Sequence, residues 1–304
     1  MDARLSAVLT TLNSVVLGKE HQIKLSISCL LAHGHLLIED LPGMGKTTLS
    51  HAIAKVLGLQ YQRIQFTSDM LPSDIVGSSV FQQQVNGQEA GFVLHKGPVF
   101  SQLVLADEIN RATPKTQSAL LEAMEERQVS IDGKTQLLPN PFFVIATQNP
   151  SSQSGTFPLP ESQLDRFLMK IELGYPTQEA ERMLLEGKKA NIDNVQAMIS
   201  LDEFFAYQDK IQKVLTSSAL LDYVQRLVFA TRHNKALNYG LSPRGALALL
   251  NASKAWAMLS GRDHVIPDDV QAVFIPVAEH RLASAMGRYD SNLCQTILNT
   301  TSVL

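Results

Sequence analysis

Residues 40–48 carry glycines, a lysine and threonines at a spacing that suits phosphate binding. The segment reads Asp40-Leu41-Pro42-Gly43-Met44-Gly45-Lys46-Thr47-Thr48. In a glycine-rich turn, successive backbone N–H groups can point at phosphate oxygens, and the N-terminus of the following helix adds positive potential. The lysine of such a turn reaches the terminal phosphates, and the first threonine hydroxyl ligates Mg²⁺. We therefore predict that residues 42–48 bind a nucleoside triphosphate, with Lys46 at its phosphates and Thr47 at the metal.

The elements around this loop have the order that the motif requires. Leu36–Asp40 is a short apolar run that predicts a strand, and Leu49–Leu57 has apolar residues at helical spacing. Asp40 stands at the first position of the motif, where glycine is usual, and this departure bears on the geometry of the loop. The alternative interpretation is a chance Gly-Lys-Thr sequence in a surface turn.

Two carboxylates follow a second predicted strand. Leu103–Ala106 is apolar and leads directly into Asp107 and Glu108. Because ligands of open α/β sheets bind at the carboxyl ends of the strands, both side chains are expected at that edge. Asp107 is suited to the Mg²⁺ shell, and Glu108 to orienting a water molecule against the γ-phosphate. The alternative is a solvated acidic pair that ends a strand.

Asn149 and Arg166 are the next candidates along the chain. A third predicted strand, 142–147, delivers Asn149 to the same edge, where its amide could sense a phosphate; alternatively, Asn149 only forms a turn before Pro150. Arg166 precedes the fifth predicted strand and is a candidate arginine finger, which would offset charge on a phosphoryl group bound by a neighbouring subunit. The alternative is a surface contact between Arg166 and Asp165.

Arg244 lies at the start of a predicted helix, after Ser242 as N-cap and Pro243 at the first helical position. A cation there is unfavourable to the helix dipole, which suggests an anionic tertiary partner such as a nucleotide phosphate. We therefore interpret Arg244 as a sensor of the nucleotide, acting either on its own subunit or on the next. By contrast, Glu125–Arg127 is expected to be a solvated helix end.

The elements that must position these residues divide into two regions. Short apolar runs alternate with helical stretches up to about residue 175, which is typical of crossover units that build a mostly parallel sheet. The predicted strands are Leu36–Asp40, Tyr61–Phe66, Leu103–Asp107, Phe142–Thr147 and Leu168–Leu173. Helical periodicity then gives predicted helices near 178–188, 202–215, 217–234, 242–260 and 267–282. We predict an α/β nucleotide-binding domain at 1–175 and a small all-helical domain at 176–304.

Composition limits the classes of function. The 304 residues include 26 Lys and Arg against 29 Asp and Glu, a formal charge of −3, so no global cationic field favours nucleic-acid binding. Apolar residues make up 45% of the chain, which can bury a core in both domains. Cys29 and Cys294 form no disulfide or zinc pattern, and neither a membrane span nor a leader is evident. We expect a cytoplasmic protein without membrane insertion.

Taken in order, the glycine loop, the Asp-Glu strand, the Asn strand, the Leu-Asp-Arg-Phe segment and the arginine of the helical domain resemble the AAA+ ATPases. Longer motifs resemble the MoxR family more narrowly. These motifs are residues 41–47, 107–112 (Asp-Glu-Ile-Asn-Arg-Ala), 117–126, 146–150 (Ala-Thr-Gln-Asn-Pro) and 159–167. The resemblance implies a three-layer αβα P-loop domain with a mostly parallel five-stranded sheet, followed by a helical lid domain.

The same resemblance implies a function. It points to a Mg²⁺-dependent ATPase that assembles into a ring, usually a hexamer, and acts as a chaperone-like remodeller or maturation factor of partner proteins. Family members are commonly paired with proteins that carry von Willebrand factor A domains. By this resemblance Asp107 and Glu108 are the Walker B pair and Asn149 is sensor 1. Arg166 corresponds to the arginine finger and Arg244 to sensor 2.

Three further segments fit the family. Gly18 lies in a segment that resembles the adenine side of the nucleotide site. Asn86-Gly87 and Asp132-Gly133 are turn signals between β-rich runs, and they predict hairpins at about 78–95 and 128–138. These hairpins resemble the helix-2 insert and the pre-sensor-1 hairpin, which face a central pore. The alternative is two surface hairpins without a role in partner contact.

Two other functions stay open at this point. A nucleotide-type phosphotransferase would share the glycine loop and a helical lid, but it needs an acceptor pocket, and the sequence has no arginine-rich acceptor segment. A DNA-acting AAA+ motor or loader is disfavoured by the near-neutral charge and by the absence of a basic cluster in either hairpin. Lys134, in the second predicted hairpin, is the one basic residue that keeps this alternative open. Nucleic acid is therefore not an expected partner.

Overall fold

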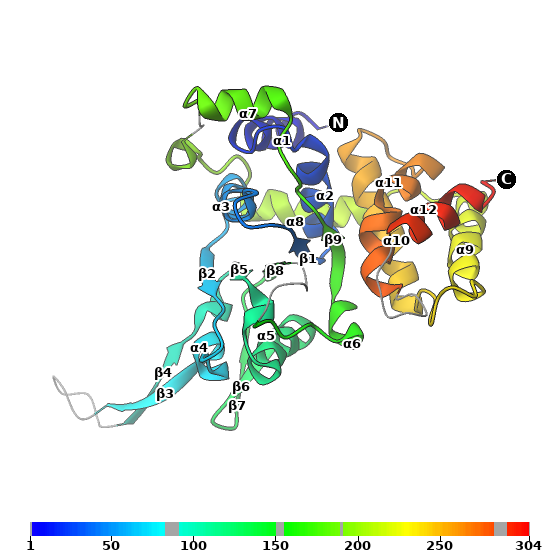
Figure 1. Cartoon of the computed structure of the whole chain (residues 1–304). Coiled ribbons are helices and arrows are strands. Elements are labelled where there is room, and N and C mark those ends of the chain that lie inside the picture. The colour runs from blue at the N-terminus through cyan, green and yellow to red at the C-terminus, as the bar shows by residue number, and fades with distance from the viewer. Residues whose placement is uncertain (1, 83–90, 150–154, 189–190, 283–290, 304) are drawn as a thin grey trace.

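The computed structural model describes residues 2–82, 91–149, 155–188, 191–282 and 291–303 (Figure 1). Its centre is a five-stranded sheet made of β1 (His35–Glu39), β2 (Tyr61–Gln65), β5 (Leu103–Asp107), β8 (Phe143–Gln148) and β9 (Phe167–Ile171). The strand order is β2-β5-β8-β1-β9, and every neighbouring pair is parallel. All five predicted strands are present, with ends shifted by at most two residues. The prediction of a parallel α/β sheet is confirmed.

Helices cover both faces of this sheet because successive strand residues point to opposite sides. Leu36 and Ile38 belong to one buried cluster, whereas Leu37 and Val104 belong to another. The first cluster includes residues of α1 (Ala3–Val15), α2 (Glu20–Leu31) and α3 (Lys46–Val56), and α5 (Pro114–Glu126) packs in the second. The three-layer αβα arrangement is therefore confirmed.

The carboxyl-terminal region is helical, as predicted. Its helices are α7 (Gln178–Leu185), α8 (Leu201–Gln212), α9 (Ser218–Arg232), α10 (Pro243–Leu259), α11 (Pro267–Ala278) and α12 (Ser291–Thr300). Helix α7 lies beside α1, and α9 to α12 form a group on the other side of the molecule (Figure 1). Tyr207 of α8 donates a hydrogen bond to Asp2, and Gln208 donates one to the carbonyl of Leu30, so α8 contacts the amino-terminal helices. The domain boundary after residue 175 stays a prediction.

Helix α12 was not predicted. Its buried residues are Cys294 and Ile297, and Leu293 and Leu298 pack against the core beside them. These four positions have helical spacing, so the signal was present in the sequence, although it extends over little more than one turn.

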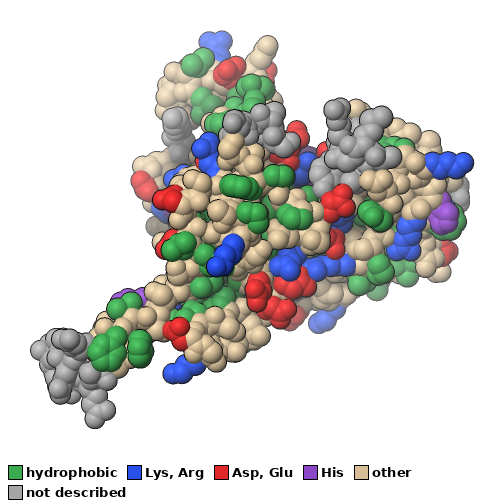
Figure 2. Space-filling model, turned by 60° about the horizontal axis from the view of Figure 1, so that its bottom comes forward, with side chains coloured by type: hydrophobic (Ala, Val, Ile, Leu, Met, Phe, Trp, Pro, Cys, Tyr) green, Lys and Arg blue, Asp and Glu red, His purple; other side chains and the backbone are tan. Residues whose placement is uncertain are grey.

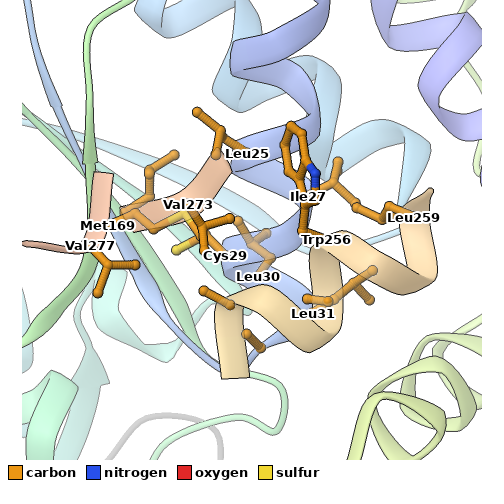
Figure 3. Packing of buried hydrophobic residues seen from close by; sticks show 14 of the residues in the cluster. Leu25, Ile27, Cys29, Leu30, Leu31, Met169, Trp256, Leu259, Val273 and Val277 are labelled. Atoms are coloured by element: carbon orange, nitrogen blue, oxygen red, sulfur yellow. The ribbon is translucent and has the colours of Figure 1, made fainter. Parts of the chain in front are cut away.

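A continuous buried cluster joins the sheet to the helical group. Figure 3 shows Leu30 of α2 near Met169 of β9, Val273 of α11 and Trp256 of α10. Helix α2 therefore contributes to the nucleotide-binding layers and also packs against α10 and α11. This shared packing fixes where the start of α10, and hence Arg244, lies relative to the sheet.

Two antiparallel hairpins extend from these layers, as predicted. They consist of β3 (Gly77–Gln82) with β4 (Gly91–Lys96), and of β6 (Gln128–Ile131) with β7 (Lys134–Leu137). Asp132 and Gly133 have φ angles of 49° and 74°, which match the two-residue turn that hairpins favour. The predicted Asn86-Gly87 turn lies outside the described residues. Phe81 and Phe92 are exposed on the longer hairpin, whose apolar side chains are green in Figure 2.

Short helices connect the larger elements. They are α4 (Pro72–Val76) and α6 (Glu161–Leu164), with 3₁₀ turns η1 (Pro98–Phe100), η2 (Ile109–Arg111), η3 (Ile192–Asn194) and η4 (Glu279–Arg281). Within the part of the chain that the structure describes, no helix is both long enough and apolar enough to cross a membrane.

Stability is expected to fall in mild acid because His35 is buried in its neutral form. Its Nδ1 accepts the N–H of Val144 at 2.9 Å, and burial lowers its pKa to about 4. A histidine with a lowered folded-state pKa stabilises the fold fully above about pH 6.5, and that contribution is lost as the pH falls toward the folded pKa. We expect the free energy of unfolding to drop by about 1.4 kcal/mol per pH unit between about pH 6 and pH 4.5 from this group.

Urea unfolding at a series of pH values measures this slope. His280 is also buried, and burial lowers its pKa, so it too makes the free energy of unfolding fall as the pH falls. A His35→Gln protein should therefore keep only part of the pH dependence. An unchanged slope in that variant would show that His35 does not titrate on unfolding.

Candidate functional site

The glycine loop joins β1 to α3 and is open toward its surroundings. Gly43 and Gly45 have φ angles of +86° and +92°, a region that L-residues with a side chain rarely adopt. A Cβ built on either glycine would meet no atom within 4 Å, so space remains beside the backbone. Lys46, the first residue of α3, donates from Nζ to the carbonyl oxygens of Asp40 at 2.5 Å and Leu41 at 3.2 Å. Thr47 follows on the exposed side of the helix start.

Asp40 has a structural role that explains the departure from glycine. Its Oδ1 accepts the N–H of Leu41 at 2.7 Å, and its Oδ2 accepts the N–H of Gly174 at 2.6 Å. Lys19 is buried and donates from Nζ to the carbonyls of Leu173, Gly174 and Tyr175 at 2.7, 2.8 and 2.5 Å. Burial lowers the pKa of Lys19, and the charge of Asp40 raises it. Together these two side chains fix the turn after β9 against the glycine loop.

We expect Asp40→Ala to lower the free energy of unfolding by about 2 kcal/mol, because both N–H groups lose a charged acceptor. Asp40→Asn keeps one acceptor oxygen and should lose less. Urea unfolding measures both values, and Glu122→Ala, at an exposed position of α5, is the matched control. Equal stability of Asp40→Ala and the parental protein would contradict the role of Asp40 in holding this turn.

The carboxylate of Asp107 is held at the end of β5. Thr147 of β8 donates to its Oδ1 at 2.6 Å, and Arg63 of β2 donates to its Oδ2 from Nε at 3.1 Å and from Nη2 at 2.7 Å. The hydroxyl of Thr147 also accepts the backbone N–H of Glu108 at 2.8 Å. Asp107 is 7% exposed, so its position is set by the two neighbouring strands.

Glu108 and Asn149 are in direct contact. Asn149 is buried and donates from Nδ2 to Glu108 Oε1 at 3.1 Å. The other carboxylate oxygen, Oε2, is contacted by Gln65 at 3.2 Å and by Arg111 at 2.8 Å. Glu108 has a φ angle of +56°, an uncommon conformation for a residue with a side chain, and such conformations cluster at functional sites. The structure therefore places Glu108 and Asn149 where the sequence predicted, at the carboxyl edge of the sheet.

These residues suit a magnesium nucleotide. Burial lowers the pKa of Lys46, and the charges of Asp40, Asp107 and Glu108 raise it, so the ammonium lies within the field of the acidic pair. The donor atoms at this edge are a threonine hydroxyl and carboxylates, which are the hard oxygen ligands that Mg²⁺ prefers. The open space beside Gly43 and Gly45 gives phosphate oxygens access to backbone N–H groups.

Arg166 and Arg244 lie together at a different place. Arg244 donates from Nη1 and Nη2 to the two carboxylate oxygens of Glu125 at 3.1 and 2.8 Å, and Arg166 Nε lies 3.9 Å from Glu125 Oε2. These hydrogen bonds lower the pKa of Glu125. Glu125–Arg127 is an exposed helix end, as expected, but Glu125 also pairs with cations from two distant segments. Asp165 bonds to Arg281 at 2.6 Å.

The Arg166–Arg244–Glu125 cluster lies at the amino edge of the sheet. A cavity of about 260 Å³ is lined by all three residues together with His35, which begins β1. Arg166 directly precedes β9, whereas Asp40 follows β1 at the opposite edge. Strands of five residues separate the two edges by roughly 13 Å. The structure thus brings Lys46, Asp107, Glu108 and Asn149 together but not Arg166 and Arg244 with them.

Gly18 contacts the start of α7. A Cβ at this position would lie 2.9 Å from Ala180 Cβ and 3.3 Å from Thr177 Oγ1, so a larger residue would force the two segments apart. The close approach brings residues 18–19 and the turn at 174–177 to the same side of the glycine loop. The assignment of Gly18 to the adenine side, which rests on the family resemblance, stays a prediction.

The sequence profile described as "ATPase family associated with various cellular activities (AAA)" matches residues 35–169, and the profile "AAA lid domain" matches residues 229–298. "Uncharacterized protein YeaC" of Bacillus subtilis is 45% identical over 273 residues, which cover 89% of this chain and 84% of that protein. "Chaperone MoxR1" of Mycobacterium tuberculosis is 42% identical over 277 residues, 88% of this chain and 72% of that protein. The chain belongs to the MoxR family of AAA+ ATPases.

A solved structure agrees with this assignment. The crystal structure of a proposed ATPase from Cytophaga hutchinsonii superposes on this MoxR-family chain with a TM-score of 0.88 and 39% sequence identity, and it covers 98% of this chain and 94% of its own. The family and the fold identify this MoxR-family protein as an ATP hydrolase.

Several residues of this MoxR-family site were missed by sequence reasoning. Arg63 and Gln65 of β2 contact Asp107 and Glu108, and Thr147 contacts both. A signal was present, since Arg63 and Gln65 are polar residues two apart in a predicted strand and therefore share one face. Nothing in the sequence order indicated that this face meets the end of β5.

Proposed function

We propose that this MoxR-family ATPase hydrolyses Mg²⁺-bound ATP in a ring of identical subunits and uses the energy to remodel partner proteins. One observation carries the proposal. Lys46, Asp107, Glu108 and Asn149 share the carboxyl edge of the sheet, whereas Arg166 and Arg244 share the amino edge. A site that needs both sets is complete only where two copies meet, and head-to-tail contacts of this kind close into rings.

The residues at the carboxyl edge divide the chemical work. Lys46 and the backbone of residues 42–48 would bind the phosphates of ATP. Thr47 and Asp107 would hold Mg²⁺, which neutralises charge on the β- and γ-phosphates when bound. Glu108 would orient the attacking water and accept its proton, and Asn149 holds Glu108 in place through the 3.1 Å hydrogen bond.

The arginine pair would complete the site of the adjacent subunit. The sequence left open whether Arg244 senses the nucleotide of its own subunit or of the adjacent subunit. Its location beside Arg166 favours the adjacent subunit. Both guanidinium groups would offset charge on the γ-phosphate as the bond to the leaving group breaks. Glu125 is their counter-ion and keeps the two cations close to each other.

The mechanical output is proposed from the family and the hairpins. A relative of this chain bears the name "Chaperone MoxR1". The hairpin β3–β4 exposes Val80, Phe81, Phe92 and Val93, an apolar surface suited to contact with a protein client. A protein with a von Willebrand factor A domain is the proposed partner, from the resemblance to the family. The cytoplasm is the proposed location, and both cysteines are buried.

Release of phosphate from ATP, with no other acceptor present, tests the proposal. Activity should require Mg²⁺, and Lys46→Ala should abolish it together with nucleotide binding. Because the site is shared between subunits, the rate per subunit should rise with protein concentration until assembly is complete. A rate strictly proportional to protein concentration across the assembly range would contradict a shared site.

A further inference from the structure

Arg63 is hydrogen-bonded to the carboxylate of Asp107, which is proposed to hold the metal. Its Nε and Nη2 donate to Oδ2 of Asp107 at 3.1 and 2.7 Å, and Thr147 donates to Oδ1 at 2.6 Å. Both oxygens of Asp107 therefore have protein partners, and only the Arg63 contact carries a positive charge.

The position of Arg63 follows from the strand register. Gln65 of β2 pairs with Asp107 of β5, so Arg63, two residues earlier, lies diagonally across from Asp107 on the same face of the sheet. The two partners differ in exposure, since 47% of the Arg63 side chain is exposed against 10% for Asp107. The guanidinium can leave this contact for solvent, whereas the carboxylate cannot move far.

A chain of contacts extends from Arg63 to Glu108. Arg63 Nη2 also donates to Gln65 Oε1 at 2.7 Å, and Gln65 Nε2 donates to Glu108 Oε2 at 3.2 Å. The amide of Gln65 is thus held at both ends, by the guanidinium on one side and by the carboxylate on the other. Among the side-chain hydrogen bonds of the described residues, loss of the Arg63 contact would leave the Gln65 amide with its bond to Glu108.

We propose that Arg63 is a positioning residue that competes with Mg²⁺ for Asp107 and, through Gln65, couples metal binding to the freedom of Glu108. The inference rests on the proposed function, in which Asp107 holds the metal. A carboxylate oxygen that accepts two guanidinium N–H groups cannot present the same lone pairs to a cation or to its water shell. Mg²⁺ carries two positive charges against one on the guanidinium, so the exchange leaves the acidic pair at least as well neutralised, and displacement is feasible.

Displacement of Arg63 has a consequence for catalysis. Once Arg63 leaves Asp107 it also leaves Gln65, and the Gln65 amide is then free to turn away from Glu108 Oε2. Glu108 would retain Asn149 on Oε1 and Arg111 on Oε2, so its position is kept while Oε2 loses one of its two partners and can accept a hydrogen bond from a water molecule. Binding of Mg²⁺ at Asp107 would therefore make Glu108 better able to accept a proton from the attacking water.

The test is the Mg²⁺ dependence of nucleotide binding by the full chain, read from the fluorescence of a methylanthraniloyl ATP analogue. Arg63→Gln removes the competing cation, so the Mg²⁺ concentration at half-maximal binding should fall by about two- to fivefold, the range of a partly exposed ion pair. Binding of the analogue in excess EDTA should stay within twofold of the parental value. The measurement requires no turnover.

Arg111→Gln is the matched control. Arg111 is 49% exposed, close to the 47% of Arg63, but it pairs with Glu108 and does not contact Asp107 in any described hydrogen bond or ion pair. Its loss should leave the Mg²⁺ midpoint within the error of the parental value. An equal shift in both variants would mean that net charge alone sets the midpoint, and the proposal would be overturned.

Other outcomes are equally decisive. An unchanged or higher midpoint for a folded Arg63→Gln protein would show that Arg63 does not compete with the metal. If Arg63→Gln fails to fold, Arg63→Lys keeps the charge but loses the two-donor geometry, and it should lower the midpoint by a smaller amount; no shift there would overturn the proposal. Failure of the proposed function would look different, because the parental protein itself would then not bind the analogue at any Mg²⁺ concentration.

Discussion

Glu108→Gln is expected to bind ATP as tightly as the parental protein and to release phosphate at least about 100-fold more slowly, the scale of a general-base contribution. Glutamine has nearly the same shape, and its amide oxygen can still accept the N–H of Asn149. It cannot accept a proton from the attacking water. The loss should therefore fall on the turnover number and leave the affinity for ATP unchanged.

Two measurements separate this result from a folding defect. Binding of the fluorescent ATP analogue shows that the site is intact, and steady-state phosphate release gives the turnover number. Glu126→Gln, at an exposed position of α5 next to Glu125, is the control and should hydrolyse ATP normally. Parental turnover by Glu108→Gln would remove Glu108 from its assigned role. A Glu108→Gln protein that retains ATP is also suited to capture a client protein by pull-down.

The carboxyl edge of the site could be predicted from the sequence because each part follows a local rule. An apolar strand ends in Asp107 and Glu108, another ends near Asn149, and the glycine loop follows a third. In a parallel sheet these ends must meet at one edge. Knowledge of the strand order was not needed to bring the three segments together.

The amino edge could not be predicted in the same way. Glu125, Arg166 and Arg244 come from α5, from the segment before β9 and from α10, and no local pattern links them. Their meeting depends on how α10 packs against α2, which is a property of the whole buried cluster. Arg63 was missed for a related reason, because its partner is set by the pairing of β2 with β5. Contacts across elements are decided by tertiary packing and leave little trace in periodicity.

Arg166→Ala is expected to lower turnover on the order of 10³-fold, the lower end of the range for an arginine finger, with little change in ATP affinity. The residue stands at the edge opposite the glycine loop, so its effect should arise in the neighbouring subunit. Arg182→Ala is the control, since Arg182 is 81% exposed on α7 and pairs only with Glu186 among the described ion pairs. That variant should keep parental turnover.

Mixing two inactive variants distinguishes action within a subunit from action between subunits. Lys46→Ala lacks a working phosphate loop but carries Arg166, whereas Arg166→Ala has the opposite defect. In a ring assembled at random from equal amounts, half of the subunits carry an intact loop and half of their neighbours carry an intact arginine. About one quarter of the parental activity per subunit should then return. If Arg166 acted within its own subunit, no site in the mixed ring would be complete and the mixture would stay inactive.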